Sequence, residues 1–203
     1  RAALLAEKFG ANSITIHLRE DRRHIRDIDL KLIRKKLKIP LNLEMAPTKE
    51  MLKIAIKSRP NFVCIVPEKR REITTEGGLN IGKNKKNLKK IITILKKNNI
   101  RVSLFIESKI KDIKLSQLLG ADCVELHAGN FCNLLNKNKK VNKSFIKLKN
   151  SANYAKLIGL EVHAGHGITY KSAKYISKIK TISEFNIGHF IIAESLFLGL
   201  NAV

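Results

Sequence analysis

Short apolar runs alternate with longer amphipathic segments along the chain, and this alternation restricts the possible folds most strongly. The apolar runs, which we expect to be strands, lie at residues 13–18, 41–45, 62–66, 102–106, 123–127 and 160–164, with a last one near 185–190. In the first run Ile14, Ile16 and Leu18 alternate with polar residues, which is the two-residue period of a strand. Strands that alternate with helices form right-handed βαβ units, so the sequence predicts an α/β protein with a parallel sheet.

The number of strands indicates a barrel. We count about seven strands, preceded by a helical segment at 2–9 that has no strand before it. A closed barrel of this type takes eight strands, each followed by a helix. The simplest interpretation is a single (β/α)8 TIM barrel domain over residues 1–203 whose first strand lies upstream of Arg1. An open, doubly wound sheet is the alternative, and the lack of a Gly-x-Gly-x-x-Gly turn after the first strand disfavours it.

Capping residues help to place the helices. Asp27 is expected to cap a helix that Pro40 ends, and Thr48 is expected to open the next one. The connection at 67–79 is the longest, and its Gly77-Gly78 pair would allow it to hinge. A second irregular segment, residues 136–143, is low in complexity and is expected to be a surface excursion, and a helix should follow near 170–180.

The charge of the chain raises nucleic acid as a partner, because the formal net charge is +23 and the pI is about 10.1. The excess is mostly Lys spread over helical segments, and aromatic residues make up only 5% with no Trp, so a specific nucleic-acid site is disfavoured. No apolar run approaches the roughly 18 residues of a membrane span. Cys64, Cys123 and Cys132 lack metal-ligand spacing and are expected to be reduced thiols in a cytoplasmic protein.

Charged and titratable residues gather at the ends of the predicted strands. His17 and Arg19 share one side of the first strand, and an imidazole beside a permanent cation suits an anionic substrate that undergoes proton transfer. The other residues of this kind are Glu44, Glu107, Glu125, His127, His166 and His189. Because the strand ends of a barrel converge on one mouth, we expect an acid–base site there. A structural polar plug is the alternative, although buried charges are costly unless they are paired.

Glycine-rich turns follow the last two predicted strands. They are Gly165-His166-Gly167 and Gly188-His189, and the second opens a helix. Barrels often bind phosphate at these positions through backbone N–H groups, so the turns predict a phosphorylated substrate, with ordinary glycine turns as the alternative. The sequence has no His-Glu-x-x-His spacing and no lysine at a clearly apolar strand end. We therefore expect neither a metal nor a lysine Schiff base.

A series of motifs in fixed order carries a family resemblance over nearly the whole chain. The motifs are Ile16-His-Leu-Arg-Glu-Asp-Arg-Arg-His-Ile25, Leu41-Asn-Leu-Glu-Met-Ala46, Val66-Pro-Glu-Lys-Arg70, Thr74-Thr-Glu-Gly-Gly78, Val102-Ser-Leu-Phe-Ile106, Ala164-Gly-His-Gly167 and Asn186-Ile-Gly-His189. With them the chain resembles the pyridoxine 5′-phosphate synthase family, which acts in the deoxyxylulose-dependent route to vitamin B6. The resemblance implies a TIM barrel that assembles as a homo-octamer in the cytoplasm and needs no cofactor.

The resemblance also implies a reaction and roles for individual residues. Two phosphorylated substrates, 1-deoxy-D-xylulose 5-phosphate and 3-amino-2-oxopropyl phosphate, would condense to pyridoxine 5′-phosphate, phosphate and water. The implied catalytic residues are His17 and Glu44 as proton acceptors, His166 as proton donor and Glu125 as transition-state stabiliser. The implied substrate-binding residues are Arg19, His24 and Thr74 for the deoxyxylulose phosphate, and Gly167, Gly188 and His189 for the amino ketone phosphate. The 67–79 segment would act as a lid.

The chain departs from the family pattern at both ends, where the family's first strand and part of its closing helix have no counterpart. We therefore expect the intact protein to be longer at both ends. Two other functions compete with the resemblance: a different phosphate-handling barrel, such as an isomerase or a thiamin-phosphate-type synthase, and a basic nucleic-acid-binding protein. The strand of His17 and Arg19, together with the Gly165–Gly167 turn, favours the vitamin B6 enzyme.

Overall fold

The computed structural model describes residues 1–68 and 77–203, and within them seven parallel strands alternate with helices. The strands are β1 (Ile14–His17), β2 (Leu41–Met45), β3 (Phe62–Ile65), β4 (Arg101–Ile106), β5 (Cys123–His127), β6 (Glu161–Gly165) and β7 (Glu184–Asn186). The helices are α1 (Ala2–Lys8), α2 (Asp27–Lys36), α3 (Lys49–Ser58), α4 (Ile81–Lys97), α5 (Ile110–Leu119), α6 (Gly129–Asn136), α7 (Asn142–Leu157), α8 (Tyr170–Ile176) and α9 (His189–Leu198). The predicted strands are all confirmed, with ends that differ by a few residues.

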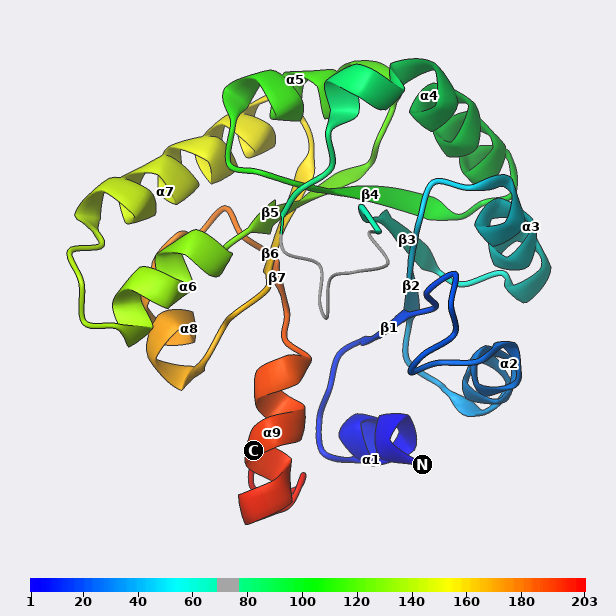
Figure 1. Cartoon of the computed structure of the whole chain (residues 1–203), viewed down its shortest axis with the longest axis horizontal. Coiled ribbons are helices and arrows are strands. Elements are labelled where there is room, and N and C mark those ends of the chain that lie inside the picture. Colours follow the sequence, from blue (N-terminus) through cyan, green and yellow to red (C-terminus); the bar gives the residue numbers. More distant parts are fainter. Residues whose placement is uncertain (69–76) are drawn as a thin grey trace.

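The strands form one sheet in sequence order, each paired in parallel with the next, and the helices surround it (Figure 1). A doubly wound sheet would reverse its strand order, so that alternative is excluded. The sheet curls into a nearly closed barrel, in which the hydroxyl of Thr15 on β1 donates to Oδ1 of Asn186 on β7 at 2.8 Å. Among the described residues, no backbone ladder joins these two strands.

Local sequence explains where several helices begin and end. Thr48 caps α3 as predicted, because its side chain accepts a hydrogen bond from the Met51 N–H at 3.3 Å. Gly120 ends α5 in the left-handed conformation, with φ of 88°. The predicted cap of α2 was wrong by one residue: Arg26 is the N-cap, and Asp27 is the first helical residue. Its carboxylate is paired with Arg22 at 2.9 Å instead.

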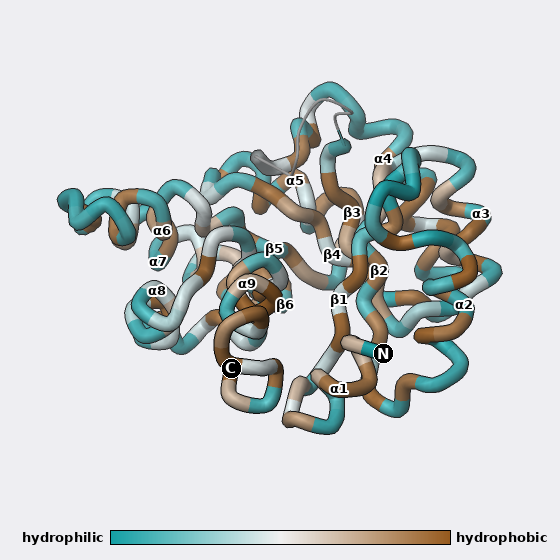
Figure 2. The backbone as a smooth tube through the Cα atoms, turned by 60° about the horizontal axis from the view of Figure 1, so that its bottom comes forward, coloured by the Kyte–Doolittle hydropathy of each residue, from teal (hydrophilic) through white to brown (hydrophobic). Residues whose placement is uncertain are grey.

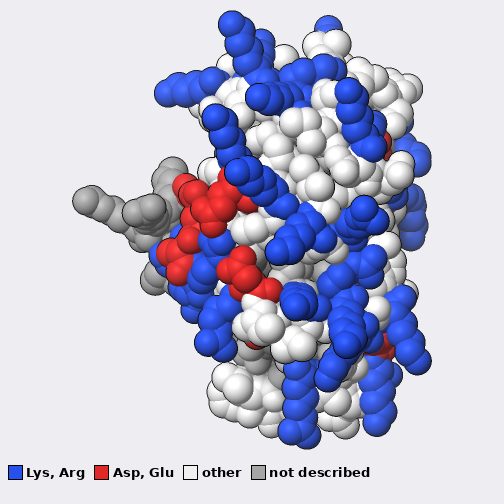
Figure 3. Space-filling model, turned by 90° about the vertical axis from the view of Figure 1, so that its right-hand side faces the viewer, with Lys and Arg blue, Asp and Glu red and all other residues white. Residues whose placement is uncertain are grey.

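The core lies between the strands and the inner faces of the helices, where the apolar stretches of the backbone gather (Figure 2). In α4, Leu88, Ile91 and Leu95 are at most 2% exposed. Full burial of such a side chain contributes roughly 1.5–3 kcal/mol. The Lys and Arg side chains spread over the outer face formed by α2, α3 and α4 (Figure 3), as expected for charge on solvated helices. All three cysteines are free and buried.

Two helical segments differ from the sequence-based prediction. Helix α6, Gly129–Asn136, was not predicted, and the connection from it to α7 is shorter than the surface excursion expected at 136–143. Gly129 and the three Asn residues of α6 are poor helix formers, so the helix depends on burial of Phe131, Cys132 and Leu135. Helix α8 ends at Ile176 rather than near 180.

Helix α9 exposes most of its apolar surface. None of its residues is buried, and Leu196 and Phe197 are 81% and 87% exposed. Figures 1 and 2 both place α9 beside α1, at the two ends of the barrel sheet. Nevertheless, none of the helices in the described ranges has the length and hydrophobicity needed to cross a bilayer.

Candidate active site

Strand pairing places His17 opposite Glu44, because these residues are register partners at the carboxyl ends of β1 and β2. Nδ1 of His17 lies 3.7 Å from Oε2 of Glu44. Burial, with a further contribution from the nearby Arg19, lowers the pKa of His17 to about 4, so its imidazole is neutral at neutral pH. Burial raises the pKa of Glu44 to about 7. The pair can therefore accept and release protons near neutral pH.

A second carboxylate, Glu68, lies beside His17 and was not singled out from the sequence as a site residue. Its oxygens lie 3.8 Å from Nε2 of His17 and 3.8 Å from Nε of Arg19, and its side chain is 2% exposed. The backbone N–H of Glu20 donates to the same carboxylate at 2.9 Å. Burial raises the pKa of Glu68, and Arg19 and the hydrogen bond from Glu20 oppose that rise. Glu68 thus fixes a buried cation next to the imidazole.

Glu125 lies inside the barrel, in the middle of β5, and is 3% exposed. The Nδ2 amide of Asn186 donates to its Oε2 at 2.9 Å, and the thiol of Cys64 donates to the same oxygen at 3.6 Å. Burial and the nearby Glu44 raise the pKa of Glu125 to about 8. Its carboxyl group is therefore protonated at neutral pH and can donate a hydrogen bond, as well as accept one.

A third group of side chains lies at the ends of β4, β5 and β6. The rings of His127 and His166 meet edge to face with centroids 5.0 Å apart, and Nδ1 of His127 lies 2.8 Å from Oε1 of Glu107. His166 has a left-handed backbone with φ of 71°, which is uncommon for a residue other than glycine. Burial lowers the pKa of His166, and His127 and His189 add to this shift.

The remaining predicted residues lie at the rim of the same mouth. Gly167, Gly188 and His189 are exposed in the turns after β6 and β7, and the N-cap of α9 is Gly188, which has no side chain to cap the helix. His24 is exposed in the loop after β1, close enough to His17 to lower its pKa. Thr74 lies outside the described residues, as does most of the 67–79 segment. The mouth therefore combines acid–base groups with backbone N–H groups that can bind an anion.

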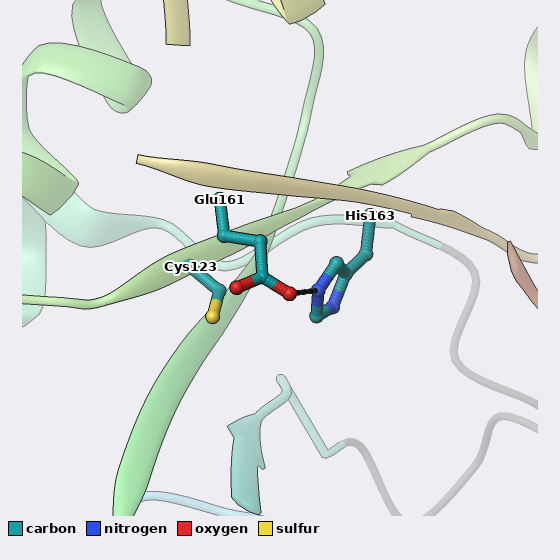
Figure 4. Close-up of side chains that lie close together, drawn as sticks. All are labelled: Cys123, Glu161 and His163. Carbon is teal, nitrogen blue, oxygen red and sulfur yellow. Dashed lines mark hydrogen bonds and ion pairs between the residues drawn. The ribbon is translucent and has the colours of Figure 1, made fainter. Parts of the chain in front are cut away.

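A separate cluster of possible metal ligands lies at the opposite end of the barrel, where β5 and β6 begin. Donor atoms of Cys123, Glu161 and His163 lie within 4.8 Å of one another (Figure 4). Sequence spacing could not indicate this cluster, because its members come from two neighbouring strands. A guanidinium nitrogen of Arg101 lies 2.6 Å from Glu161 and 3.5 Å from the Cys123 sulfur. Arg101 thus already supplies a cation to this cluster.

The order of the strands and the position of the titratable groups define a β/α barrel with histidine and carboxyl groups at the carboxyl ends of its strands, which is where barrel enzymes have their active sites. Two solved structures share the fold. A phosphoribosyl anthranilate isomerase from Thermus thermophilus has a TM-score of 0.60 at 14% identity, covering 92% of this chain and 82% of that one. A 4-hydroxy-2-oxoglutarate aldolase has a TM-score of 0.64 at 12% identity, covering 99% of this chain and 84% of that one.

Sequence comparison identifies the family. The family described as "Pyridoxal phosphate biosynthesis protein PdxJ" matches residues 1–203, and the chain belongs to it. Pyridoxine 5′-phosphate synthase of Pelagibacter ubique is 56% identical over 193 residues, which are 95% of this chain and 81% of that protein. The protein of the same name from Sulfurihydrogenibium is 51% identical over 203 residues, or 98% of this chain and 83% of that protein. The predicted family, barrel fold and role as an enzyme of vitamin B6 biosynthesis are confirmed.

Proposed function

We propose that the chain catalyses the pyridoxine 5′-phosphate synthase reaction, the condensation of 1-deoxy-D-xylulose 5-phosphate with 3-amino-2-oxopropyl phosphate. The products are pyridoxine 5′-phosphate, inorganic phosphate and water. The observation that carries the proposal is the His17–Glu44 pair at the barrel mouth, with Nδ1 and Oε2 3.7 Å apart and a buried arginine two residues further along the chain. A ring closure that loses water needs several proton transfers, and this pair can perform them near neutral pH.

The electrostatics of the pair support roles as proton acceptors. His17 is neutral at neutral pH because burial lowers its pKa to about 4, so its imidazole has a free lone pair. Glu44 titrates at about 7, which is close to the pKa that suits a general base at neutral pH. Desolvation thus moves the two pKa values in opposite directions, as is common in acid–base sites.

Glu125 is suited to stabilise a transition state. Its raised pKa keeps the carboxyl group protonated, so it can donate a hydrogen bond to an oxygen that becomes negative. Asn186 fixes the direction of the carboxyl group through the 2.9 Å hydrogen bond to Oε2. His166, in the turn directly after β6, is proposed as the proton donor.

The two phosphate groups are assigned to different parts of the mouth. Arg19 and His24, with Thr74 from the segment outside the described residues, would bind the deoxyxylulose phosphate. The amino ketone phosphate would lie between the turns after β6 and β7, against Gly167, Gly188 and His189. The first turn of α9 supports this assignment, because its N-cap, Gly188, has no side chain to accept from the first backbone N–H groups, and the helix dipole favours an anion.

We further propose that residues 1–203 belong to a single eight-stranded barrel that assembles as a homo-octamer in the cytoplasm. No backbone ladder in the described residues joins the edges of β1 and β7, so the sheet is open along this seam and an eighth strand would complete the barrel there. The exposed apolar side chains of α9 support a contact with further protein. The three free cysteines agree with a reducing compartment.

Phosphate release from the two substrates together tests the proposed reaction in the full-length protein. We expect release only when both substrates are present, and a loss of at least about 100-fold in His17→Ala. Asn153→Ala is the control, because this residue of α7 makes only an exposed hydrogen bond with Thr181 in the described part of the chain and should retain activity. Release in the absence of the amino ketone, or undiminished release in His17→Ala, would contradict the proposal.

A further inference from the structure

Glu107 and His127 form a hydrogen-bonded pair beside the proposed proton donor, and neither has a role in the reaction described above. Nδ1 of His127 lies 2.8 Å from Oε1 of Glu107, and the backbone N–H of Gly78 donates to the same oxygen at 3.1 Å. The hydrogen bond with His127 lowers the pKa of Glu107 to about 2, so Glu107 is a carboxylate that can only accept. Nδ1 of His127 must therefore carry the hydrogen.

The pair has little freedom to move, because the surrounding residues hold it from several sides. Ile106 and Glu107 lie so close to Gly78 that a Cβ at position 78 would overlap their backbone atoms. The ring of Phe105 packs against His127 with centroids 5.3 Å apart. A Cβ at position 129 would lie 2.5 Å from Nε2 of His127 and 2.9 Å from Cδ2 of His166. The first residue of α6 must therefore be a glycine for the two imidazoles to share this space.

His166 needs support from its neighbours, because its backbone lies in the left-handed region with φ of 71°. That conformation costs a residue with a side chain roughly 1–2 kcal/mol. The next residue, Gly167, is also left-handed with φ of 73°, so the turn itself supplies little restraint on the ring. The described contact that orients the imidazole is the edge-to-face packing on His127, with an interplanar angle of 64°.

A histidine–carboxylate pair alone is not evidence of function, and the same barrel shows this. Glu161 and His163 are also 2.8 Å apart, at the end of the barrel remote from the mouth (Figure 4). In the described part of the chain no hydrogen bond, ion pair or ring contact joins that pair to His166, although His163 is the register partner of Glu125 on the neighbouring strand. The Glu107–His127 pair differs because its imidazole packs directly on His166.

We propose that Glu107 and His127 are positioning residues for His166: the carboxylate fixes the tautomer and plane of the His127 ring, and that ring holds the His166 imidazole in its strained turn. The assignment of His166 as proton donor belongs to the proposed function, and the positioning role rests on it. Nε2 of His127 is buried and has no hydrogen-bond partner in the described part of the chain. The described contacts of His127 are with Glu107, Phe105 and His166, so its proposed effect on the reaction runs through His166.

Glu107→Gln tests the pair kinetically in the full-length enzyme, with Glu161→Gln as the matched control. Glu107→Gln keeps the shape of the side chain but brings an amide that can donate to Nδ1, so His127 loses its fixed tautomer. We expect kcat to fall by about 10- to 100-fold, because small misplacement of a catalytic group has effects of this size, while KM stays within about twofold. Glu161→Gln should keep kcat within about twofold of the wild type. Equal kcat values for the two variants would overturn the proposal.

Histidine nitrogen NMR on the same proteins gives a reading that does not depend on activity. In the wild type the His127 ring should be the Nδ1–H tautomer, and the ring signals of His166 should shift in Glu107→Gln but not in Glu161→Gln. An Nε2–H tautomer, or an unchanged His166 in Glu107→Gln, would overturn the positioning role even if the wild type releases phosphate as expected. If Glu107→Gln fails to fold, His127→Gln replaces it in both measurements. Failure of the wild type to release phosphate would instead count against the proposed function.

Discussion

The carboxyl group of Glu125 occupies the space that a side chain at position 165 would fill. A Cβ added to Gly165 would overlap Oε1 of Glu125. Strands β5 and β6 pair in parallel, with Glu125 opposite His163 and His127 opposite Gly165. The glycine at the end of β6 is therefore a steric requirement of the buried carboxyl group on β5.

Gly165→Ala should be destabilised by about 1–3 kcal/mol, because the added methyl group forces Glu125 or the strand to move. The same movement should reduce phosphate release. Denaturant unfolding and the release assay measure the two effects. Gly82→Ala in α4 is the control, since its Cβ would meet nothing closer than 3.6 Å, and it should stabilise the helix by roughly 0.5–1 kcal/mol. Equal stability of Gly165→Ala and the wild type would contradict the steric match.

The raised pKa of Glu125 predicts how stability depends on pH. The usual pKa of 4.5 rises to about 8 in the folded protein, so between these values the folded state holds a proton that the unfolded state releases. The contribution of Glu125 to the free energy of unfolding is thus complete below about pH 4.5 and is lost as the pH rises toward 8. For this one group, the free energy of unfolding changes by at most about 1.4 kcal/mol per pH unit. Glu125→Gln should gain stability relative to the wild type as the pH increases from 5 to 8, as measured by urea unfolding. A difference that is constant with pH would contradict the prediction.

Asn186 connects three strands of the barrel through its amide group. Its Oδ1 accepts from Thr15 on β1 at 2.8 Å, and its Nδ2 donates to Glu125 on β5 at 2.9 Å. Asn186→Ala should lower the free energy of unfolding by about 2 kcal/mol, because two partners inside the barrel lose their hydrogen bonds. Asn153→Ala removes an exposed hydrogen bond to Thr181 and should change stability by less than about 0.5 kcal/mol. Similar losses in the two variants would show that the barrel does not depend on Asn186.

Inorganic phosphate should bind at the first turn of α9 and stabilise the protein. At a concentration about ten times its Kd, phosphate should raise the free energy of unfolding by about 1.4 kcal/mol relative to potassium chloride of equal ionic strength. His189→Ala should lose most of this gain, because His189 is the first residue of the helix. Thermal unfolding with and without phosphate provides the measurement. The same gain in His189→Ala would place the anion elsewhere.

The sequence predicted the barrel because the signals for its strands and helix ends are local. The apolar run of β3 and the capping residue Thr48 each act within a few residues of their own position. Helix α6 was missed for the same reason. Its stability comes from burial of Phe131 and Leu135 against other elements, and its local helix propensity is weak.

Part of the candidate site was also predictable. A histidine or glutamate at the end of an apolar strand must lie at the carboxyl edge of a parallel sheet, so the approximate place of His17 and Glu44 followed from the sequence. Glu68 could not be found in this way, because it follows a strand within a highly charged segment whose other residues give no sign of burial. Only the contacts with His17 and Arg19 distinguish it.

The sequence by itself determined the order of the strands, the parallel sheet and the edge of that sheet at which titratable groups gather. The reason is that hydrophobic periodicity and helix capping are properties of neighbouring residues. The tertiary structure decided which of those groups meet. Asn186 reaches a carboxyl group 61 residues away in the sequence, and His127 packs on His166 through the space above Gly129. Such contacts depend on the register of neighbouring strands and on the curvature of the barrel, and with them come the burial and charge that shift the pKa values of the site.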